Sequence, residues 1–347
     1  MNINNLLIDE DNSVLEAMKL LDKTAKQVIF IAPENKLKAV ITDGDIRRHI
    51  LRGGSLEEPV HKIANYSPKF IPENQKNKAQ DFLKKYCIRA LPIVNEERKI
   101  VSLVFADDLE ITNKKNIINA PVVIMAGGLG TRLHPYTKVL PKPLIPIGDL
   151  PITEHIINRF KGFGCTEFYL ILNHKKNMIK SYFNDLDKDY DLKYVDELVP
   201  LGTGGGLSLL KGKVNSTFFF SNCDILIDAD YHDIYKFHKK QGNVITMICA
   251  FKHITIPYGI VNLDNQGRIH SMIEKPEYAF LTNTGMYIVE PRVIEELDPD
   301  ISVSFPEIFD KYRLSEQKVG IYPINEQCWM DMGQIEELEE MKKRLEV

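Results

Sequence analysis

Short apolar runs alternate with amphipathic segments from residue 121 to residue 347. The apolar runs are continuous, which is typical of strands that are buried on both faces of a sheet. The amphipathic segments carry helical spacing or the glycines that end helices. This alternation predicts an α/β fold with an open, mixed and mostly parallel Rossmann-like sheet, in which ligands bind at the carboxyl ends of the strands. The apolar runs lie at 121–126, 167–173, 217–223 and 244–251, and the amphipathic segments at 152–164, 202–212 and 231–243.

The first 111 residues contain two copies of one pattern, about 60 residues apart. Each copy has a helix and a strand, then a second strand that ends in a small acidic turn. The first copy lies at 13–51 and the second at 77–111. Two such copies predict a module whose halves bury each other's apolar faces. The pattern resembles a tandem CBS (Bateman) α/β module at 1–111, and a polar linker at 112–120 would join it to a catalytic domain at 121–347.

Composition narrows the function classes. The 44 Lys and Arg residues against 48 Asp and Glu leave no basic field that would attract nucleic acid. The five cysteines follow neither metal-ligand nor disulfide spacing. There is no basic segment followed by an apolar one at the N-terminus and no long apolar span. We therefore expect a cytoplasmic protein that binds neither membranes nor nucleic acid.

A glycine-rich loop follows the first strand of the second half. Gly127, Gly128 and Gly130 precede Arg132, and Lys142 stands between two prolines ten residues later. This spacing fits neither a P-loop nor a dinucleotide fingerprint. It resembles the signature of the nucleotidyltransferases that make nucleotide-sugars, whose fold is of the GT-A type, and the resemblance extends from Val122 almost to the C-terminus.

The resemblance implies roles for these residues. Backbone N–H groups of the glycine loop would approach a triphosphate closely. Arg132 would neutralise the departing pyrophosphate, and Lys142 would place a point charge on the phosphates. The alternative is a glycine-rich turn with surface Arg and Lys. The expected nucleotide-binding loop comprises Ala126, Gly127, Gly128, Gly130 and Thr131.

Two carboxylates are expected to bind Mg²⁺. Asp224 follows a buried strand where a carboxylate has no use in packing, and the family's usual N-G-D is here Asn222-Cys223-Asp224. Asp331 lies in a segment that resembles the family's W-x-D-[IM]-G. Together they would hold one or two magnesium ions against the α-phosphate. Either one alone could instead be a turn or helix-cap residue.

Three further segments would bind the sugar phosphate. They fall in the order that the resemblance implies, with Glu274 accepting from sugar hydroxyls and Lys275 holding the acceptor's phosphate. Taken singly, these segments could be ordinary turns. The expected sugar-phosphate residues are Tyr258, Gly259, Glu274, Lys275, Asn283 and Gly285.

The resemblance also bears on the nucleobase. Gly202 is expected close to the base, and Glu197 stands where related uridylyl- and thymidylyltransferases often carry glutamine. A carboxylate only accepts hydrogen bonds, and guanine presents two adjacent donors, whereas uracil and thymine present two acceptors around one donor. GTP is therefore the favoured NTP. Asp196 could take this role instead, or backbone groups alone could select the base.

The chemistry implied is attack by a sugar 1-phosphate on the α-phosphorus of an NTP, giving an NDP-sugar and pyrophosphate. UTP, CTP or dTTP remain alternatives to GTP. A glycosyltransferase that uses Asp228 and Asp230 is a rival, although these acids suit a helix N-terminus. An inactive nucleotide-sugar sensor is another. The combination with a Bateman module resembles glucosamine-1-phosphate and mannose-1-phosphate guanylyltransferases of bacterial surface-sugar pathways, including legionaminic acid synthesis.

The N-terminal module is expected to carry one regulatory nucleotide site. Thr42 and Asp45 resemble the ribose and phosphate clamp of CBS domains, whereas the second copy has Phe105 in place of the threonine and keeps Asp108. A T-x-x-D turn is equally a helix cap, so a structural role remains open. The module is also expected to pair with another chain in a homodimer.

Overall fold

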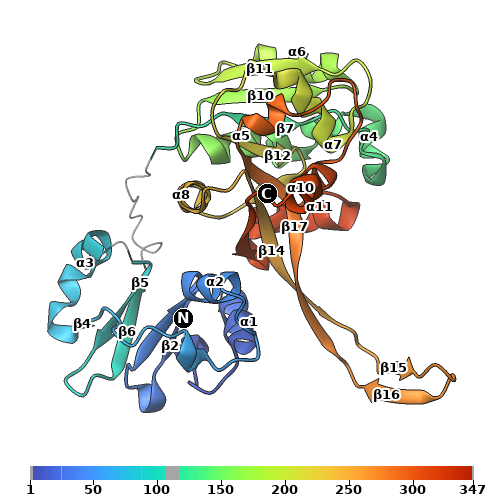
Figure 1. Cartoon of the computed structure of the whole chain (residues 1–347). Coiled ribbons are helices and arrows are strands. Elements are labelled where there is room, and N and C mark those ends of the chain that lie inside the picture. The colour runs from blue at the N-terminus through green and yellow to red at the C-terminus, as the bar shows by residue number, and fades with distance from the viewer. Residues whose placement is uncertain (1–2, 25, 87, 106–116, 346–347) are drawn as a thin grey trace. The chain divides into compact units, whose positions relative to one another are not determined.

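The computed structural model describes residues 3–24, 26–86, 88–105 and 117–345. The chain divides into two compact units, Met1–Lys114 and Lys115–Val347 (Figure 1). Ile118 and Ala120, at the end of the predicted linker, are buried in the core of the second unit. In the described residues, no helix combines the length and apolar character that a membrane span requires. Asp108 and residues 112–116 of the predicted linker lie outside the described residues.

The first unit contains two three-stranded sheets of the same construction. In each, the first two strands are parallel and the third is antiparallel to the second. The strands are β1 (Leu7–Ile8), β2 (Val28–Ile31) and β3 (Ala39–Thr42) in one sheet, and β4 (Ile71–Pro72), β5 (Ala90–Val94) and β6 (Ile100–Phe105) in the other. Helices α1 (Val14–Thr24) and α3 (Ala79–Tyr86) occupy equivalent places between the first and second strands, and α2 (Asp43–Leu51) follows β3.

The second unit is built on a seven-stranded sheet with the order β11-β10-β7-β12-β17-β14-β18. The four strands from β11 to β12 are mutually parallel, β17 is antiparallel to both of its neighbours, and β14 pairs parallel with β18. The predicted mixed and mostly parallel sheet is therefore confirmed. In sequence order the strands are β7 (Val122–Met125), β10 (Glu167–Leu172), β11 (Asp191–Asp196), β12 (Phe218–Asn222), β14 (Ile245–Thr255), β17 (Glu277–Val289) and β18 (Val319–Asn325).

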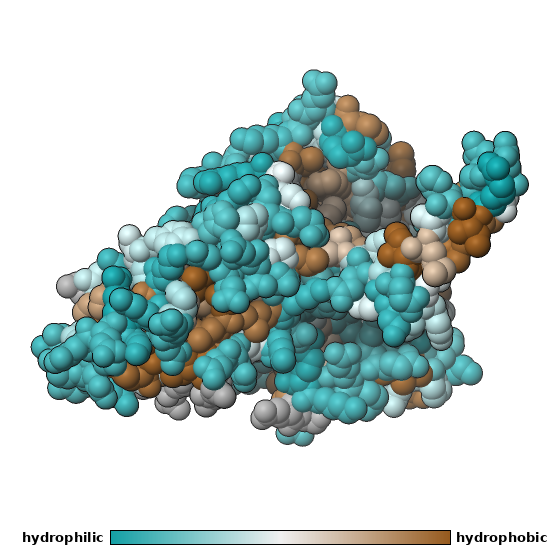
Figure 2. All heavy atoms as spheres, turned by 90° about the horizontal axis from the view of Figure 1, so that it is seen from below, coloured by the Kyte–Doolittle hydropathy of each residue, from teal (hydrophilic) through white to brown (hydrophobic). Residues whose placement is uncertain are grey.

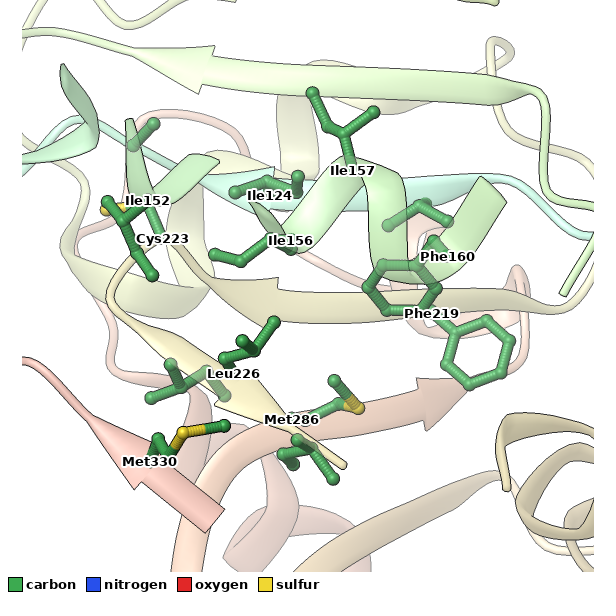
Figure 3. Packing of buried hydrophobic residues seen from close by; sticks show 14 of the residues in the cluster. Ile124, Ile152, Ile156, Ile157, Phe160, Phe219, Cys223, Leu226, Met286 and Met330 are labelled. Atoms are coloured by element: carbon green, nitrogen blue, oxygen red, sulfur yellow. The ribbon is translucent and has the colours of Figure 1, made fainter. Parts of the chain in front are cut away.

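Apolar side chains cover both faces of this sheet. Along β7, Val122 and Ile124 belong to one core cluster and Val123 and Met125 to another, because successive side chains of a strand point to opposite faces. Figure 3 shows helix α5 packing its isoleucines and Phe160 into the first cluster. The longer helices are α5 (Ile152–Lys161), α6 (Lys176–Asp185), α8 (Tyr231–Gln241), α10 (Phe305–Leu314) and α11 (Ile335–Arg344).

Residues 202–212 form a shorter helix than the predicted one. Helix α7 (Gly202–Gly205) gives way to a 3₁₀ turn at Gly206–Leu210. Four glycines weaken the helix. Gly202, Gly204 and Gly205 lie where the backbone approaches residues 301–305, and Gly206 lies against Glu197. The remaining short elements are α4 (Tyr136–Val139), α9 (Arg292–Glu295), the ribbons β8 (Pro146–Ile147) with β9 (Leu150–Pro151) and β13 (Ile225–Ile227) with β19 (Trp329–Asp331), and the 3₁₀ turns Thr131–Leu133 and Lys142–Leu144.

Strands β14 and β17 continue beyond the sheet as a two-stranded stem. Their pairing runs without a break from Cys249 with Asn283 to Thr255 with Glu277. Beyond the stem lies a hairpin of β15 (Ile260–Leu263) and β16 (Ile269–Ile273), which pair only with each other among the described strands. Figure 1 shows stem and hairpin projecting from the sheet; we call residues 252–280 the arm.

Candidate active site

The predicted catalytic residues follow strands whose carboxyl ends meet at one edge of the sheet. Met125 of β7 is in register with Ile171 of β10 and Asn222 of β12. Leu172 of β10 is in register with Asp196 of β11. The glycine loop, residues 173–175, Glu197 and Asp224 therefore leave the sheet at the same edge, where ligands bind in open α/β sheets.

Close packing accounts for two of the three glycines in the loop after β7. A β-carbon on Gly127 would lie 2.8 Å from Glu197 Oε2. Gly130 has a φ of +66°, and a β-carbon there would lie 2.8 Å from Thr137 Cγ2 and 3.2 Å from Lys142 Cβ. A β-carbon on Gly128 would meet nothing within 4 Å. Packing does not require Gly128, which leaves its backbone accessible to a ligand.

Lys142 and Asp224 form an ion pair at this edge. Lys142 Nζ donates to Asp224 Oδ2, and the two side chains are only 12% and 14% exposed. Burial lowers the pKa of Lys142, but the Asp224 carboxylate outweighs that effect and the pKa lies above its ordinary value. The lysine is therefore charged, and its cation is fixed beside the strand end.

Asp331 lies next to this ion pair. Residue 331 of β19 is in register with Ile225 of β13, and Met332 N donates to Asp224 O at 2.8 Å. Burial and the nearby Asp224 and Glu337 charges raise the pKa of Asp331 to about 6. Among the described residues, Asp331 Oδ1 is buried without a hydrogen-bond partner. Two carboxylates that repel one another, one with an orphaned oxygen, favour a cation between them.

This donor set fits magnesium better than a metal held by protein alone. In the parts of the chain that the structure describes, no three His, Cys, Asp or Glu residues converge as metal ligands. Mg²⁺ commonly binds through one or two carboxylates together with substrate phosphates and water. Asp224 and Asp331 could supply the two carboxylates.

Arg132 carries a charge that no described residue neutralises. It is exposed in the 3₁₀ turn Thr131–Leu133 and makes no hydrogen bond or ion pair with any described residue. Its charge nevertheless lowers the pKa of Asp331, so it lies within electrostatic range of the carboxylates. An exposed guanidinium beside a buried Lys–Asp pair can receive a polyphosphate without breaking an existing contact.

Glu197 is a buried carboxylate beneath the glycine loop. It is 5% exposed and lies between Gly127 and Gly206. A β-carbon on Gly206 would lie 2.6 Å from Glu197 Oε1. Burial raises the pKa of Glu197 to about 7, against a smaller lowering by the Leu201 backbone N–H. Oε1 has no hydrogen-bond partner among the described residues. Asp196, the alternative, already pairs with two lysines, Lys176 at 3.2 Å and Lys180 at 2.8 Å.

Gly202 serves the packing of the chain. Its φ is +76°, and a β-carbon there would lie 2.7 Å from Val303 O. Gly204 N and Gly205 N both donate to the same carbonyl oxygen. The contacts therefore explain this glycine without a nucleobase.

The structure separates the predicted sugar-phosphate residues into two groups. Asn283 and Gly285 lie in β17, and a β-carbon on Gly285 would lie 2.5 Å from Nδ2 of Asn222, which stands two residues before Asp224. The other four lie on the arm, where a β-carbon on Gly259 would lie 2.9 Å from Glu274 Oε2. In the described part of the chain, no hydrogen bond or ion pair joins the Lys142–Asp224 pair to this second group, which comprises Tyr258, Gly259, Glu274 and Lys275.

The turn after β10 was not predicted as part of the site. Lys175 Nζ donates to the carbonyl oxygens of Thr137, Lys138 and Val139 at 3.0, 2.8 and 3.0 Å. His174 N donates to Gly127 O, and Asn173 Nδ2 donates to Glu197 O, both at 3.3 Å. The turn thus holds three parts of the site. Its polar sequence directly after a buried strand was the available signal.

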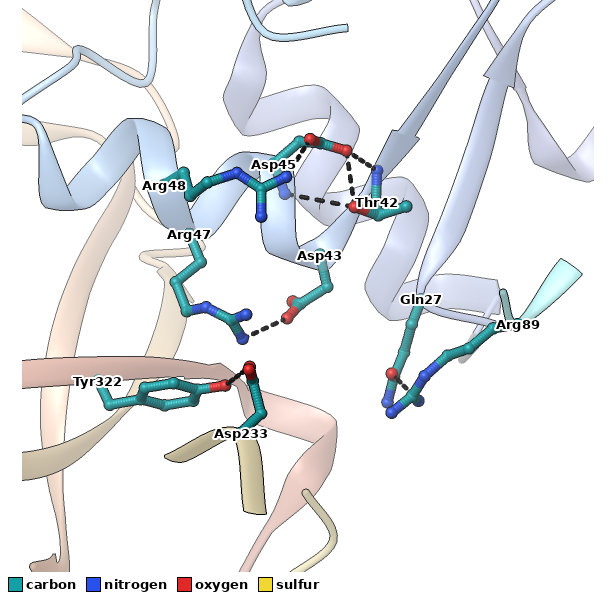
Figure 4. Close-up of polar contacts among 9 residues, drawn as sticks. All are labelled: Gln27, Thr42, Asp43, Asp45, Arg47, Arg48, Arg89, Asp233 and Tyr322. Atoms are coloured by element: carbon teal, nitrogen blue, oxygen red, sulfur yellow. Dashed lines mark hydrogen bonds and ion pairs between the residues drawn. The ribbon is translucent and has the colours of Figure 1, made fainter. Parts of the chain in front are cut away.

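Two other predicted groups have local partners. In Figure 4, Thr42 and Asp45 bond to each other as a capping box at the start of α2, and Arg48 pairs with Asp45. Asp230 caps α8 by accepting from His232 N and Asp233 N, and Asp228 pairs with Arg159. Asp228 and Asp230, which a glycosyltransferase would use, therefore have structural roles in an ion pair and at the start of a helix.

Known proteins match the second unit. Mannose-1-phosphate guanyltransferase of Aspergillus oryzae is 33% identical over 226 residues, covering 61% of this chain and 60% of that protein. Mannose-1-phosphate guanylyltransferase catalytic subunit beta of Dictyostelium discoideum is 31% identical over 220 residues, with the same two shares. The chain thus matches 60% of the length of these relatives.

A solved structure shares the fold. HddC from Yersinia pseudotuberculosis, complexed with GMP-PN, matches with a TM-score of 0.50 at 24% identity, covering 65% of this chain and 99% of that one. A model of the Nucleotidyl transferase family matches residues 121–346. This range contains the glycine loop, the seven-stranded sheet and both carboxylates. The chain belongs to the nucleotidyl transferase family.

Proposed function

We propose that this chain transfers a guanylyl group from GTP to a sugar 1-phosphate and releases pyrophosphate. One observation carries the proposal: four charged groups lie beside a glycine loop at the carboxyl ends of the strands. They are the charged Lys142, the carboxylates of Asp224 and Asp331, and Arg132, which pairs with no described residue. The relatives named mannose-1-phosphate guanylyltransferases support the same class of reaction.

The reaction needs no nucleophile from the protein. A phosphate oxygen of the sugar 1-phosphate forms a bond to the α-phosphorus of GTP, and the bond from that phosphorus to the bridging oxygen of the β-phosphate breaks. The electron pair leaves with pyrophosphate. Arg132 neutralises the leaving group, and Lys142 offsets the repulsion between the two phosphate-bearing substrates. The protein contributes positioning and charge.

Asp224 and Asp331 are proposed to hold Mg²⁺ when the substrates bind. The ion would supply Lewis-acid polarisation of the α-phosphate oxygens. Oδ1 of Asp331 has no hydrogen-bond partner among the described residues, and burial together with the nearby Asp224 and Glu337 charges raises the pKa of its carboxyl. Both features support this assignment, because a divalent cation would stabilise the buried carboxylate. Lys142 holds Asp224 in place before the substrates arrive.

Glu197 is proposed to select guanine. Its carboxylate is buried below the glycine loop, where Oε2 faces Gly127 and Oε1 faces Gly206 without a hydrogen-bond partner among the described residues. A carboxylate can accept from the N1–H and 2-amino donors of guanine side by side. Uracil and thymine would place acceptor oxygens against this carboxylate, and two acceptors repel each other. The discrimination expected from such a pair is about 1–3 kcal/mol.

The acceptor is proposed to be a hexose 1-phosphate such as mannose 1-phosphate or glucosamine 1-phosphate, for bacterial surface glycans or legionaminic acid. Gly285, whose β-carbon would lie 2.5 Å from Asn222 Nδ2, and Asn283, two residues before it, are proposed to contact its phosphate. Tyr258, Gly259, Glu274 and Lys275 stay predicted sugar-phosphate residues on the arm.

The first unit is proposed to be a tandem CBS module with a regulatory nucleotide site at Thr42 and Asp45, in a homodimer. The duplicated three-stranded sheet supports a repeated module. The capping box engages both side chains with each other, so a nucleotide would have to compete for them. Calorimetry of the full chain with adenine and guanine nucleotides, with Thr42→Val for comparison, tests the site.

Variants at the site test the proposed reaction. Arg132→Ala, Lys142→Ala and Asp224→Asn should each lower the rate of pyrophosphate release from GTP and mannose or glucosamine 1-phosphate by about 100-fold or more, because one transition-state charge contact contributes about 3 kcal/mol. Lys138→Ala, an exposed lysine four residues before Lys142, is the matched control and should retain the wild-type rate. Near-wild-type rates in all three site variants would contradict the proposal.

A further inference from the structure

The ammonium of Lys142 lies on the carboxylate that is proposed to bind the metal ion. Lys142 Nζ donates to Oδ2 of Asp224, and the charge of Asp331 acts on the same ammonium. Hydrophilic residues cover most of the face shown in Figure 2, whereas the side chains of Lys142 and Asp224 are only 12% and 14% exposed. Water and salt screen exposed ion pairs strongly and buried pairs much less. The attraction within this pair is therefore stronger than that of an ordinary surface pair.

An ammonium and a divalent cation compete for this carboxylate. Lys142 is charged and already takes Oδ2 of Asp224. A divalent cation at the other oxygen would stand beside a second positive charge, and like charges repel strongly where water is largely excluded. A metal ion that reaches the protein without a nucleotide would therefore have to displace the lysine.

The lysine can leave Asp224 without a movement of the backbone. Lys142 stands between Pro141 and Pro143 at the start of the 3₁₀ turn, where the proline rings restrict the main chain. Its side chain starts beside the glycine loop, because a β-carbon on Gly130 would lie 3.2 Å from Lys142 Cβ. Rotation about the bonds of the flexible lysine stem can carry the ammonium from Asp224 toward phosphates in that loop.

A triphosphate attracts this ammonium more strongly than one carboxylate does, because it carries several negative charges. Arg132, which is exposed and pairs with no described residue, offers the same phosphates a second cation. An exchange of partners would follow, in which Lys142 turns to the phosphates and both oxygens of Asp224 become available.

We infer that Lys142 blocks the metal site of the free protein, and that the phosphates of a bound nucleotide open the site by withdrawing its ammonium from Asp224. The inference rests on the proposed function, in which Asp224 and Asp331 hold Mg²⁺. The two carboxylates then take up the divalent cation together with the nucleotide rather than before it.

Titration of the full chain with Mn²⁺ alone tests the block. Mn²⁺ accepts the same carboxylate ligands as Mg²⁺, and electron paramagnetic resonance measures the free ion. Lys142→Met keeps the length of the side chain without its charge, and should lower the Kd for Mn²⁺ by about tenfold or more relative to the wild type. This gain in affinity is opposite in direction to the loss of turnover expected when Lys142 is removed.

Two further variants locate the effect. Arg132→Met removes a nearby positive charge that makes no ion pair with Asp224, and should lower the Kd by about threefold or less. Lys142→Met combined with Asp224→Asn should lose the tighter binding, because the freed carboxylate is gone. An unchanged Kd in Lys142→Met, an equal fall in Arg132→Met, or tight binding that persists in the double variant would overturn the inference.

The wild type gives a second measurement that does not depend on a variant folding. The relaxation rate of water protons reports Mn²⁺ bound to the protein. The probe is a GTP analogue with a nitrogen bridge between the α- and β-phosphorus, which the proposed reaction cannot cleave. Mn²⁺ should bind the wild type about tenfold or more weakly in its absence than in its presence. Equal binding in both cases would overturn the inference.

These titrations use no sugar phosphate and measure no turnover. Their result is therefore separate from that of the pyrophosphate-release assay, and a failure of one is distinguishable from a failure of the other.

Discussion

At the scale of single residues, the buried carboxylate of Glu197 gives the most distinctive prediction. Its folded pKa of about 7 lies above its ordinary 4.5, so its contribution to stability is full below pH 4.5 and is lost as the pH rises through 7. Glu197→Gln should therefore raise the free energy of unfolding at pH 8 by about 2–3 kcal/mol and have little effect at pH 4.5.

Denaturant unfolding of both proteins at the two pH values measures this difference. Affinity for GTP should rise with pH, because guanine needs the ionised carboxylate. The Kd for GTP should therefore fall for the wild type between pH 6 and 8 and stay unchanged for Glu197→Gln. If the variant and the wild type differed in free energy of unfolding by the same amount at both pH values, Glu197 would be solvated in solution.

Sequence reasoning singled out residues that the structure brings together at the carboxyl ends of the strands. Arg132, Lys142, Asp224 and Asp331 could be singled out because they are charged residues that follow a strand or lie in a segment of recognisable sequence. The packing role of Gly202 could not, because its contact is with Val303, about a hundred residues away. Long-range backbone contacts leave no local pattern.

At the scale of elements, the turn after β10 positions the site. Lys175 bonds the three last carbonyls of α4, the helix that leads into the segment of Lys142. Lys175→Met should lower the turnover number about 10-fold or more, since small displacements of catalytic groups are costly. It should also lower stability by about 1–3 kcal/mol through the lost hydrogen bonds.

Steady-state kinetics separate this role from a purely structural one. Lys175→Arg, which keeps the donors, should recover part of the turnover number, and Lys240→Met, at an exposed position on α8, should have no effect. A loss of stability with an unchanged turnover number would leave Lys175 a structural residue.

The start of helix α2 offers a simpler test. Thr42 Oγ1 accepts from Asp45 N, and Asp45 Oδ2 accepts from Thr42 N at 2.8 Å. Removing the cap in Thr42→Ala should destabilise the first unit by about 1 kcal/mol. Urea unfolding followed by circular dichroism measures it; an unchanged midpoint would show that the cap contributes nothing in solution.

Element types were predicted more reliably than element lengths. The four apolar runs from residue 121 onward all became strands of one sheet, because a continuous apolar run requires cover on both faces. The helix in the segment at 202–212 is shorter than expected because three of its glycines pack closely against residues 301–305. The arm was not predicted, since nothing in its sequence shows that β14 and β17 outrun the sheet.

At the scale of the whole molecule, a unit of the nucleotidyl transferase family is joined to a unit with a duplicated sheet. The family match accounts for the glycine loop, the Lys–Asp pair and the second carboxylate. The first unit, where regulation is proposed, lies outside that match.

The measurement that tests the central claim most directly is product formation by the full chain. Wild-type protein with Mg²⁺ is supplied with each of GTP, UTP, CTP, ATP and dTTP, together with mannose 1-phosphate or glucosamine 1-phosphate, and products are identified by mass spectrometry. The account predicts a GDP-sugar and pyrophosphate, with GTP used about 10–100-fold faster than UTP. No nucleotide-sugar from any pair, or faster use of UTP or dTTP than of GTP, would contradict it.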